Sequence, residues 1–474
     1  MIKLIAKNEW INIWRNKTAA IMVAVFICIL GLAAYIGAEN TITQNNIRHK
    51  YQTEVKDQWM TQPDRHPHRV AHYGYLVFRE KAPLSFFDFG IESFVGNSVF
   101  LEAHRQNSVN LSEAGFSNGL LRFGELSMAM VLQLLIPLFI FFIGFGTVAS
   151  LKENGVLKIL LSQGISVKTL LWGKIAGIFS FVMALFLTVV VIGFILMAGM
   201  EGFQFSTDLI MRSGVMILLY SLYFAVCSWA AVMVSAYAKK AGNALVILIL
   251  LWMACGIVIP KGSQTIGTGL YPSISKLQFE KNIEEDLSKE GDSHDPDDPH
   301  FTAFKLATLE EYGVETVKDL PFNYSGYVMA EGERITSKLF NEHFERLINT
   351  YQNQNRVSDL LSFINPYLMV RNASMAIAGT DMASYIDFQR QSEAYRYNNS
   401  QWLNKIHTYQ INAENDKAQR VSNELFQNKE VFEYRSRSLT WSLGHNVLLL
   451  IALIFWVLVA IGSVAVLSKK ITVI

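Results

Sequence analysis

Residues 150–177 read SLKENGVLKILLSQGISVKTLLWGKIAG and separate two long apolar segments. Four lysines and one glutamate surround an apolar cluster, a pattern typical of a short amphipathic helix at a membrane surface. Gly164 suits the C-cap of this helix, and Ser166 suits the N-cap of the helix that follows. The stretch therefore predicts a short surface helix and a turn between two membrane helices, with no room for an enzyme active site.

The composition is that of a membrane protein with a substantial aqueous part. Hydrophobic residues make up 51% of the chain and charged residues only 17%, whereas soluble proteins have about 25% charged residues. The formal net charge is +1, which gives no reason to expect a nucleic-acid partner. The three cysteines, Cys28, Cys227 and Cys255, lie in apolar runs, which argues against a disulfide framework.

Six segments are apolar over the length that a membrane helix needs, about 20 residues. They are residues 19–38, 126–150, 170–200, 209–237, 241–260 and 447–467. The chain that flanks these helices on one side carries twelve lysines and arginines against two acidic residues. Because basic loops stay in the cytoplasm, we expect a multi-pass protein of the bacterial inner (plasma) membrane with both termini cytoplasmic.

This topology places two large segments, residues 39–125 and 261–439, outside the cytoplasm. The first begins as a continuation of the first membrane helix and then contains strand-like runs at 72–80 and 97–105, whereas the second is mostly helical. We therefore expect an α-helical membrane protein with six transmembrane helices. An amphipathic elbow helix at residues 1–18 precedes them, and the two insertions form a mostly helical (α+β) extracytoplasmic domain.

Residues 152–174 resemble the first cytoplasmic loop of ABC-2-type transporter permeases. The positions that match the family pattern are Glu153, Gly155, Leu157, Leu160, Leu161, Ser162, Gly173 and Lys174, and those that depart from it are Lys152 and Val156. Residues 66–106 and 361–396 resemble a subgroup with a large extracytoplasmic domain of unknown function. Its members include relatives of the permease in nitrous-oxide-reductase maturation.

The resemblance implies that this chain works with a separate ATPase. The chain contains no GxxxxGK(S/T) phosphate-binding loop, and in this family ATP-Mg is bound and hydrolysed by an ABC ATPase subunit. The resemblance thus implies a permease subunit that is not an enzyme, paired with a second permease copy in a homodimer or a paralogous heterodimer. Its expected role is export or extraction of an unidentified substrate. The alternative is a mechanotransmission module, in which ATP-driven motion acts on a periplasmic partner without transport.

The same resemblance assigns roles at the cytoplasmic side. Residues 151–169 are the coupling loop, which docks on the ATPase through Glu153, Gly155, Leu157, Leu160, Leu161 and Ser162. The elbow helix either takes part in this coupling or only anchors the chain in membrane lipid. Residues 468–474 form a cytoplasmic tail.

Two polar residues interrupt the membrane helices. Gln133 in the second helix either lines a transport path or makes an interhelical hydrogen bond. Arg212 lies near the outer end of the fourth helix, where we expect its side chain to extend toward the headgroups.

Four histidines of the first insertion form a candidate metal site. His66, His68 and His72 are close in sequence, and His104 joins them if the two strand-like runs pair. Imidazole suits zinc or copper, and the alternative is an ordinary hydrogen-bonding network. We expect no other cofactor in this chain, since no Ser-His-Asp or HExxH pattern is present.

Overall fold

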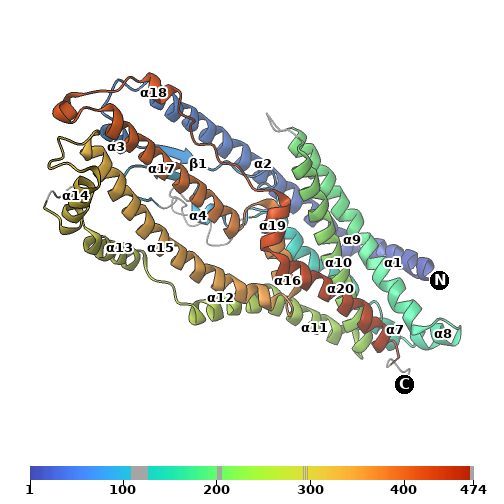
Figure 1. Ribbon diagram of the computed structural model, residues 1–474. Helices are drawn as coiled ribbons and strands as arrows, with labels where there is room; N and C mark the ends of the chain where they lie inside the picture. Colours follow the sequence, from blue (N-terminus) through green and yellow to red (C-terminus); the bar gives the residue numbers. More distant parts are fainter. Residues whose placement is uncertain (108–125, 200–204, 292, 294, 296, 470–474) are drawn as a thin grey trace.

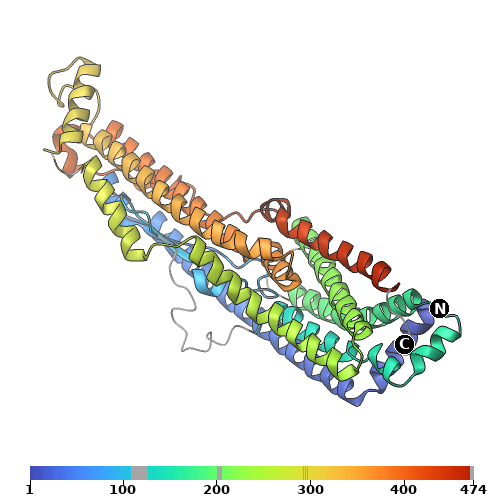
Figure 2. The same ribbon diagram turned by 90° about the horizontal axis from the view of Figure 1, so that it is seen from below.

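The computed structural model describes residues 1–107, 126–199, 205–291, 293, 295 and 297–469. Long apolar helices gather at one end of an elongated molecule, and a mostly helical domain forms the other end (Figure 1). The N-terminus, the C-terminal end of α20 and the short helix α8 (Val156–Ser162) lie at the end remote from this domain, as the turned view confirms (Figure 2). This arrangement is the one that the predicted topology requires.

Among the described residues, six helical segments are long and apolar enough to cross a membrane, and each overlaps one of the predicted spans. They are α2 (Lys17–Met60), α5–η3–α6 (Met128–Met130, Val131–Leu135, Ile136–Gly144) continuing to α7 (Ala149–Glu153), α9 (Val167–Ala198), α10 (Thr207–Tyr237), α11–η4–α12 (Ala241–Met253, Ala254–Val258, Ile259–Leu270) and α20 (Val447–Leu467). The second and fifth spans each contain a π-helical turn, η3 and η4. The predicted end of the third span, Met200, lies outside the described residues.

The first span is far longer than a bilayer requires. Helix α2 has 44 residues, which corresponds to about 66 Å of helix, whereas the hydrocarbon core measures about 30 Å. Asn16 separates it from α1 (Ile2–Arg15), because the Asn16 backbone is extended and its side chain accepts hydrogen bonds from the Thr18 and Ala19 amides. The predicted continuation of the first membrane helix into the first insertion is confirmed, and the helix ends at Met60.

We call the part of the molecule beyond the membrane spans the large domain. It contains the far half of α2 and the remaining elements, including the helices next to the spans. These elements are α3 (Pro67–Tyr73), β1 (Tyr75–Phe78), α4 (Glu92–Val95), β2 (Ser98–Leu101), α13 (Lys276–Glu290), α14 (Pro299–Tyr312), α15 (Tyr324–Leu361), α16 (Pro366–Ala378), α17 (Met382–Gln410), η5 (Ala413–Ala418), α18 (Glu424–Gln427) and α19 (Leu439–His445). Strands β1 and β2 pair antiparallel with Leu76 opposite Phe100, so the two strand-like runs do meet. Each strand spans only four residues.

The two insertions share one hydrophobic core. Trp59, Val77 and Val99 from the first insertion lie in the same buried cluster as Phe388 and Phe426 from the second. The indole ring of Trp59 meets the Phe426 ring edge-on, with centroids 6.0 Å apart. Because neither segment encloses this core alone, the large domain is a single folding unit made from both.

Arg212 fastens this domain to the membrane helices. Its guanidinium donates hydrogen bonds to the carbonyl of Ile377 at the end of α16 (2.7 Å), to the carbonyl of Arg437 (2.6 Å) and to Asp208 one turn earlier on α10 (2.6 Å). The Arg212 side chain is only 10% exposed. The expectation that it extends to the headgroups is wrong, because backbone carbonyls of the large domain satisfy its donors instead.

The contact between α2 and the chain before α4 provides a stability test with a matched control. A Cβ added at Gly37 would lie 2.1 Å from the carbonyl oxygen of Phe86, whereas one added at Gly31 would meet nothing within 4 Å. We expect Gly37→Ala to cost about 1–3 kcal/mol, as overpacking usually does. Gly31→Ala is expected to be neutral or slightly stabilising, since alanine favours the helix. Thermal unfolding of the detergent-purified protein, followed by tryptophan fluorescence, checks this; equal midpoints for the two variants would contradict the close packing.

Candidate functional site

The hairpin formed by α7 and α8 is built by two glycines and a serine. Gly155 joins the helices with a left-handed backbone (φ 71°), a conformation that costs little only for glycine. After α8, Gly164 (φ 83°) and Ile165 donate their amides to the carbonyls of Leu161 and Leu160, closing the helix. Ser166 then accepts a hydrogen bond from the Thr169 amide at the start of α9. Ser166 is the N-cap of α9 as predicted, whereas the C-cap of α8 is Gln163, and Gly164 is the left-handed residue directly after it.

The predicted coupling residues divide into those available to a partner and those that are not. Leu157 is buried, at 4% exposure, and Leu160 and Leu161 are half-buried. Ser162 is exposed, and so is Ile159 at 57%. Ile159 therefore offers an apolar contact point on the surface of α8. Our sequence reasoning missed it because the family pattern carries no requirement at that position.

Glu153 has a partner within the chain. Its Oε2 accepts a hydrogen bond of 3.1 Å from the amide of Ala241, the first residue of α11. A carboxylate at a helix N-terminus also interacts favourably with the helix dipole. Lys152 next to it donates to the carbonyls of Ala236 and Ala238, at the end of α10. The hairpin is therefore attached to the fourth and fifth spans.

Helix α1 lies against α9 at unusually short range. A Cβ at Gly173 would lie 2.6 Å from Cβ of Ile5, and one at Gly177 would lie 2.6 Å from Cβ of Glu9. The Trp10 indole donates to the Ser180 hydroxyl at 2.8 Å. Glycine is required at both positions because any side chain would push the two helices apart.

A buried ion pair joins the same two helices. Lys174 on α9 donates to Glu9 on α1, and both side chains are about 5% exposed. The Thr147 hydroxyl, in the chain just before α7, donates to the second oxygen of Glu9 at 2.9 Å. Glu9 thereby links the elbow, α9 and the approach to the hairpin. The sequence signal for this role was that Glu9 is the only acidic residue of α1, beside two lysines and an arginine.

Gln133 makes the predicted interhelical hydrogen bond and also borders a cavity. It lies in η3, donates to the Tyr220 hydroxyl on α10 at 2.8 Å, and its carbonyl accepts from Tyr223 at 2.9 Å. A cavity of about 270 Å³ lies beside it, with Trp252 and Trp456 among the lining residues. Single π-helical turns are frequent at functional sites, so this region remains the candidate for a path.

A chain of hydrogen bonds connects Gln133 with the large domain. The Tyr220 hydroxyl lies 3.0 Å from the Ser374 hydroxyl, which donates to Asp88 at 2.5 Å. Burial raises the pKa of Asp88 to about 6, although hydrogen bonds from Ser374 and the Gly90 amide act in the opposite direction. These hydrogen bonds lead from the second span through α10 and α16 to the loop before α4.

The four predicted metal ligands fall into two groups. His68, His72 and His104 each place one ligand atom within 4.8 Å of the others. His66 instead lies with His407 and Asp416. These last two residues were missed because they are more than 300 positions away in the sequence, so only the folded chain brings them near His66.

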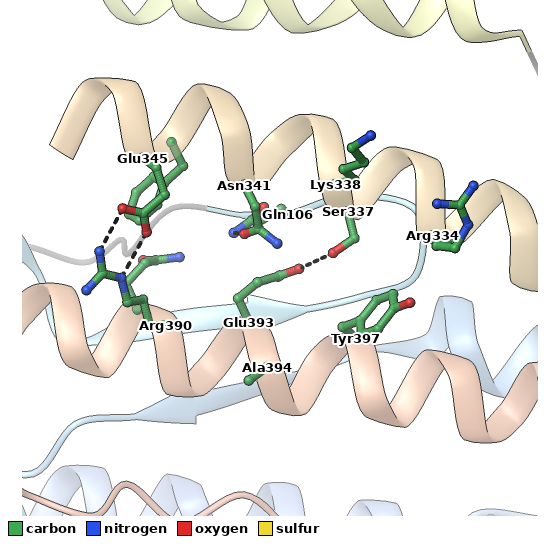
Figure 3. Close-up of a pocket in the computed structure, with 12 residues that line it drawn as sticks. Gln106, Arg334, Ser337, Lys338, Asn341, Glu345, Arg390, Glu393, Ala394 and Tyr397 are labelled. Atoms are coloured by element: carbon green, nitrogen blue, oxygen red, sulfur yellow. Dashed lines mark hydrogen bonds and ion pairs between the residues drawn. The ribbon is translucent and has the colours of Figure 1, made fainter. Parts of the chain in front are cut away.

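A polar pocket of about 520 Å³ lies in the large domain between α15 and α17 (Figure 3). The Arg390 guanidinium forms an ion pair with Glu345 at one end, and the Ser337 hydroxyl donates to Glu393 in the floor. Charges of both signs line the pocket, so it suits a polar ligand or a polar segment of a partner.

Comparison with known protein families divides the chain into two parts. Residues 101–270 match the family described as ABC-2 family transporter protein. Residues 276–435 match a domain of unknown function, DUF3526. No curated protein matches the chain. The first match contains the α7–α8 hairpin and four of the six spans, and the second begins at the first residue of α13.

The buried ion pair of the elbow makes a prediction about stability. Removing one member of a buried pair leaves an uncompensated charge and costs about 3–5 kcal/mol, so Lys174→Met should strongly lower the midpoint of thermal unfolding. The double variant Glu9→Gln/Lys174→Met should recover much of that loss. Lys168→Met is the matched control, since Lys168 is an exposed lysine of the same helix. Similar midpoints for Lys174→Met and Lys168→Met would refute the role of the pair.

Proposed function

We propose that this chain, a membrane permease with an ABC-2 family transporter domain and an additional domain, couples ATP hydrolysis by a separate ABC ATPase to movement of its helices. The observation that carries the proposal is the α7–α8 hairpin, which presents the exposed Ile159 beside Lys158 at the end remote from the large domain. In this proposal both termini and the hairpin face the cytoplasm of a bacterial cell, and the large domain lies outside. A second permease copy, identical or paralogous, completes the assembly.

Contacts of the hairpin supply a route for force. Lys152 binds the end of α10, Glu153 binds the start of α11, and Thr147 binds Glu9 of the elbow. A displacement of α8 by the ATPase would therefore be transmitted to α1, α10 and α11 together. The elbow is in this respect part of the coupling device as well as an anchor.

Export or extraction of a substrate is the first candidate function. The cavity next to Gln133 gives the membrane part a site of about 270 Å³, lined largely by apolar and aromatic side chains. Such a lining fits an amphipathic or apolar group better than a free ion. The substrate would move between two such permeases as their helices rearrange.

Mechanotransmission is the second candidate, favoured by two connections. Helix α2 runs without interruption from the membrane part into the large domain, and Arg212 binds α10 to the carbonyls of Ile377 and Arg437. Movement of the spans would then reorient the large domain against a periplasmic partner, with nothing crossing the membrane.

Docking of the ATPase is tested at the exposed tip of α8. Ile159→Asp places a charge in an apolar contact and should weaken co-purification of the ATPase by about tenfold or more, as loss of an interface anchor does. The rate of ATP hydrolysis by the assembled complex should fall as co-purification of the ATPase falls. Gln163→Glu, which adds a charge to an exposed polar position on the same hairpin, should leave both unchanged. An Ile159→Asp permease that retains its ATPase would exclude this docking surface.

A further inference from the structure

Three imidazoles of the large domain lie close together near the C-terminal end of β2. His68 and His72 lie one turn apart on α3, so their side chains share one face of the helix. His104 approaches from the turn that follows β2, with its ring centroid 5.1 Å from that of His72 and 5.8 Å from that of His68. Two segments that are separate in sequence therefore meet at one point, because β1 and β2 pair.

The spacing of these rings is that of a metal site. The Nε2 atoms of His68 and His72 lie 3.2 Å apart. In a tetrahedral site with metal–nitrogen bonds of about 2.0–2.1 Å, neighbouring nitrogens lie about 3.3 Å apart. The third ligand atom, from His104, lies within 4.8 Å of both. The three imidazoles are therefore close enough together to serve as ligands of one ion.

The backbone of His104 is held in an uncommon conformation. Among the described residues it is the only one other than glycine with a positive φ, 61°. Glu333 on α15 fixes this conformation, since its Oε2 accepts the His104 amide at 2.9 Å and lies 3.3 Å from Nδ1 of the ring. Strained backbone of this kind clusters at functional sites.

Glu333 also sets the orientation of the His104 ring. A carboxylate on one ring nitrogen directs the other nitrogen toward a metal and raises its basicity. Glu333 is fully buried and paired with Arg396. Burial raises the pKa of Glu333, but the hydrogen bonds from His104 and the charge of Arg396 outweigh it and hold the pKa at about 2.

His66 does not belong to this site. Its Nδ1 accepts the His68 amide at 3.3 Å, and its Nε2 lies 3.1 Å from Asp416 Oδ1. The same oxygen of Asp416 binds His407 at 2.8 Å and accepts from Asn323 at 3.1 Å. The Nδ1 atom of His66 thus caps α3, and its Nε2 atom binds α3 to Asp416 of η5, so both nitrogens have structural roles.

We propose that His68, His72 and His104 bind one divalent transition-metal ion of the zinc or copper class. Three imidazoles leave a fourth position, and because His72 is exposed that position faces solvent. A site with three protein ligands and one open position is the arrangement of metal centres that bind or pass on an exogenous ligand. The proposal does not depend on ATPase coupling, since no residue of the hairpin takes part.

The test is metal content of the full-length chain, purified in detergent through an affinity tag that contains no histidine. The protein is stripped with a chelator, dialysed against zinc chloride or, separately, cupric chloride, and analysed by mass spectrometry of the metal. We expect one retained equivalent of either ion, and its loss in His72→Ala, a change at an exposed position. His66→Gln and the matched surface control His49→Ala, also exposed, should retain it.

Two results would overturn the site. One is wild-type protein that retains neither ion at a stoichiometric level, and the other is His72→Ala protein that retains as much as wild type. The role of Glu333 has its own readout, since Glu333→Gln should weaken affinity by about 10–100-fold in competition with a chelating dye. Unchanged affinity in a folded Glu333→Gln variant would remove the positioning role and leave the three ligands in place.

Discussion

One buried guanidinium group, that of Arg212, makes several of the polar contacts between the membrane spans and the large domain. A buried arginine requires partners for all of its donors, and Arg212 finds them in Asp208 and in two carbonyls that belong to the large domain. Asp208 in turn accepts the amide of Leu439 at 2.7 Å, at the start of α19. Separating the domain from α10 would leave these groups unpaired in a water-poor region, which is why the contact is held in one geometry.

Polar contacts in the membrane part follow the same logic. Gln133, Tyr220 and Ser374 satisfy one another across three helices, and Asp88 closes the chain from the domain side. In a low dielectric each such bond is stronger than in water, and each orphaned group is costlier. This series of hydrogen bonds therefore fixes the relative rotation of η3, α10 and α16. Like the contacts of Arg212, it joins the membrane spans to the large domain.

Features encoded locally could be predicted from the sequence. The six spans follow from hydropathy, and Ser166 acts through its own backbone neighbours, so both were correctly expected. The exposed face of α8 was only partly foreseen, because burial of Leu157 and exposure of Ile159 depend on what packs beneath the helix. The role of Glu9 needed its distant partner Lys174.

Long-range pairing limited the prediction of the histidine site. His68, His72 and His104 could be grouped because strand pairing is a simple inference, whereas His66 was assigned to the wrong group. Its true neighbours are His407, near the end of the 29-residue helix α17 of the second insertion, and Asp416, which lies just after that helix in η5. The prediction for Arg212 was wrong for the same reason. Its acceptors are backbone carbonyls, which every residue carries, so the sequence does not show where they lie.

The continuity of α2 has a mechanical consequence. About half of its 44 residues extend past the membrane part, which corresponds to about 33 Å of rigid rod. Tilting such a rod by about 10° displaces its far tip by about 6 Å, several times the movement near the pivot. Any small rearrangement of the spans would thus be amplified at the tip, where Trp59 packs in the shared core, and the large domain would move farther than the spans themselves.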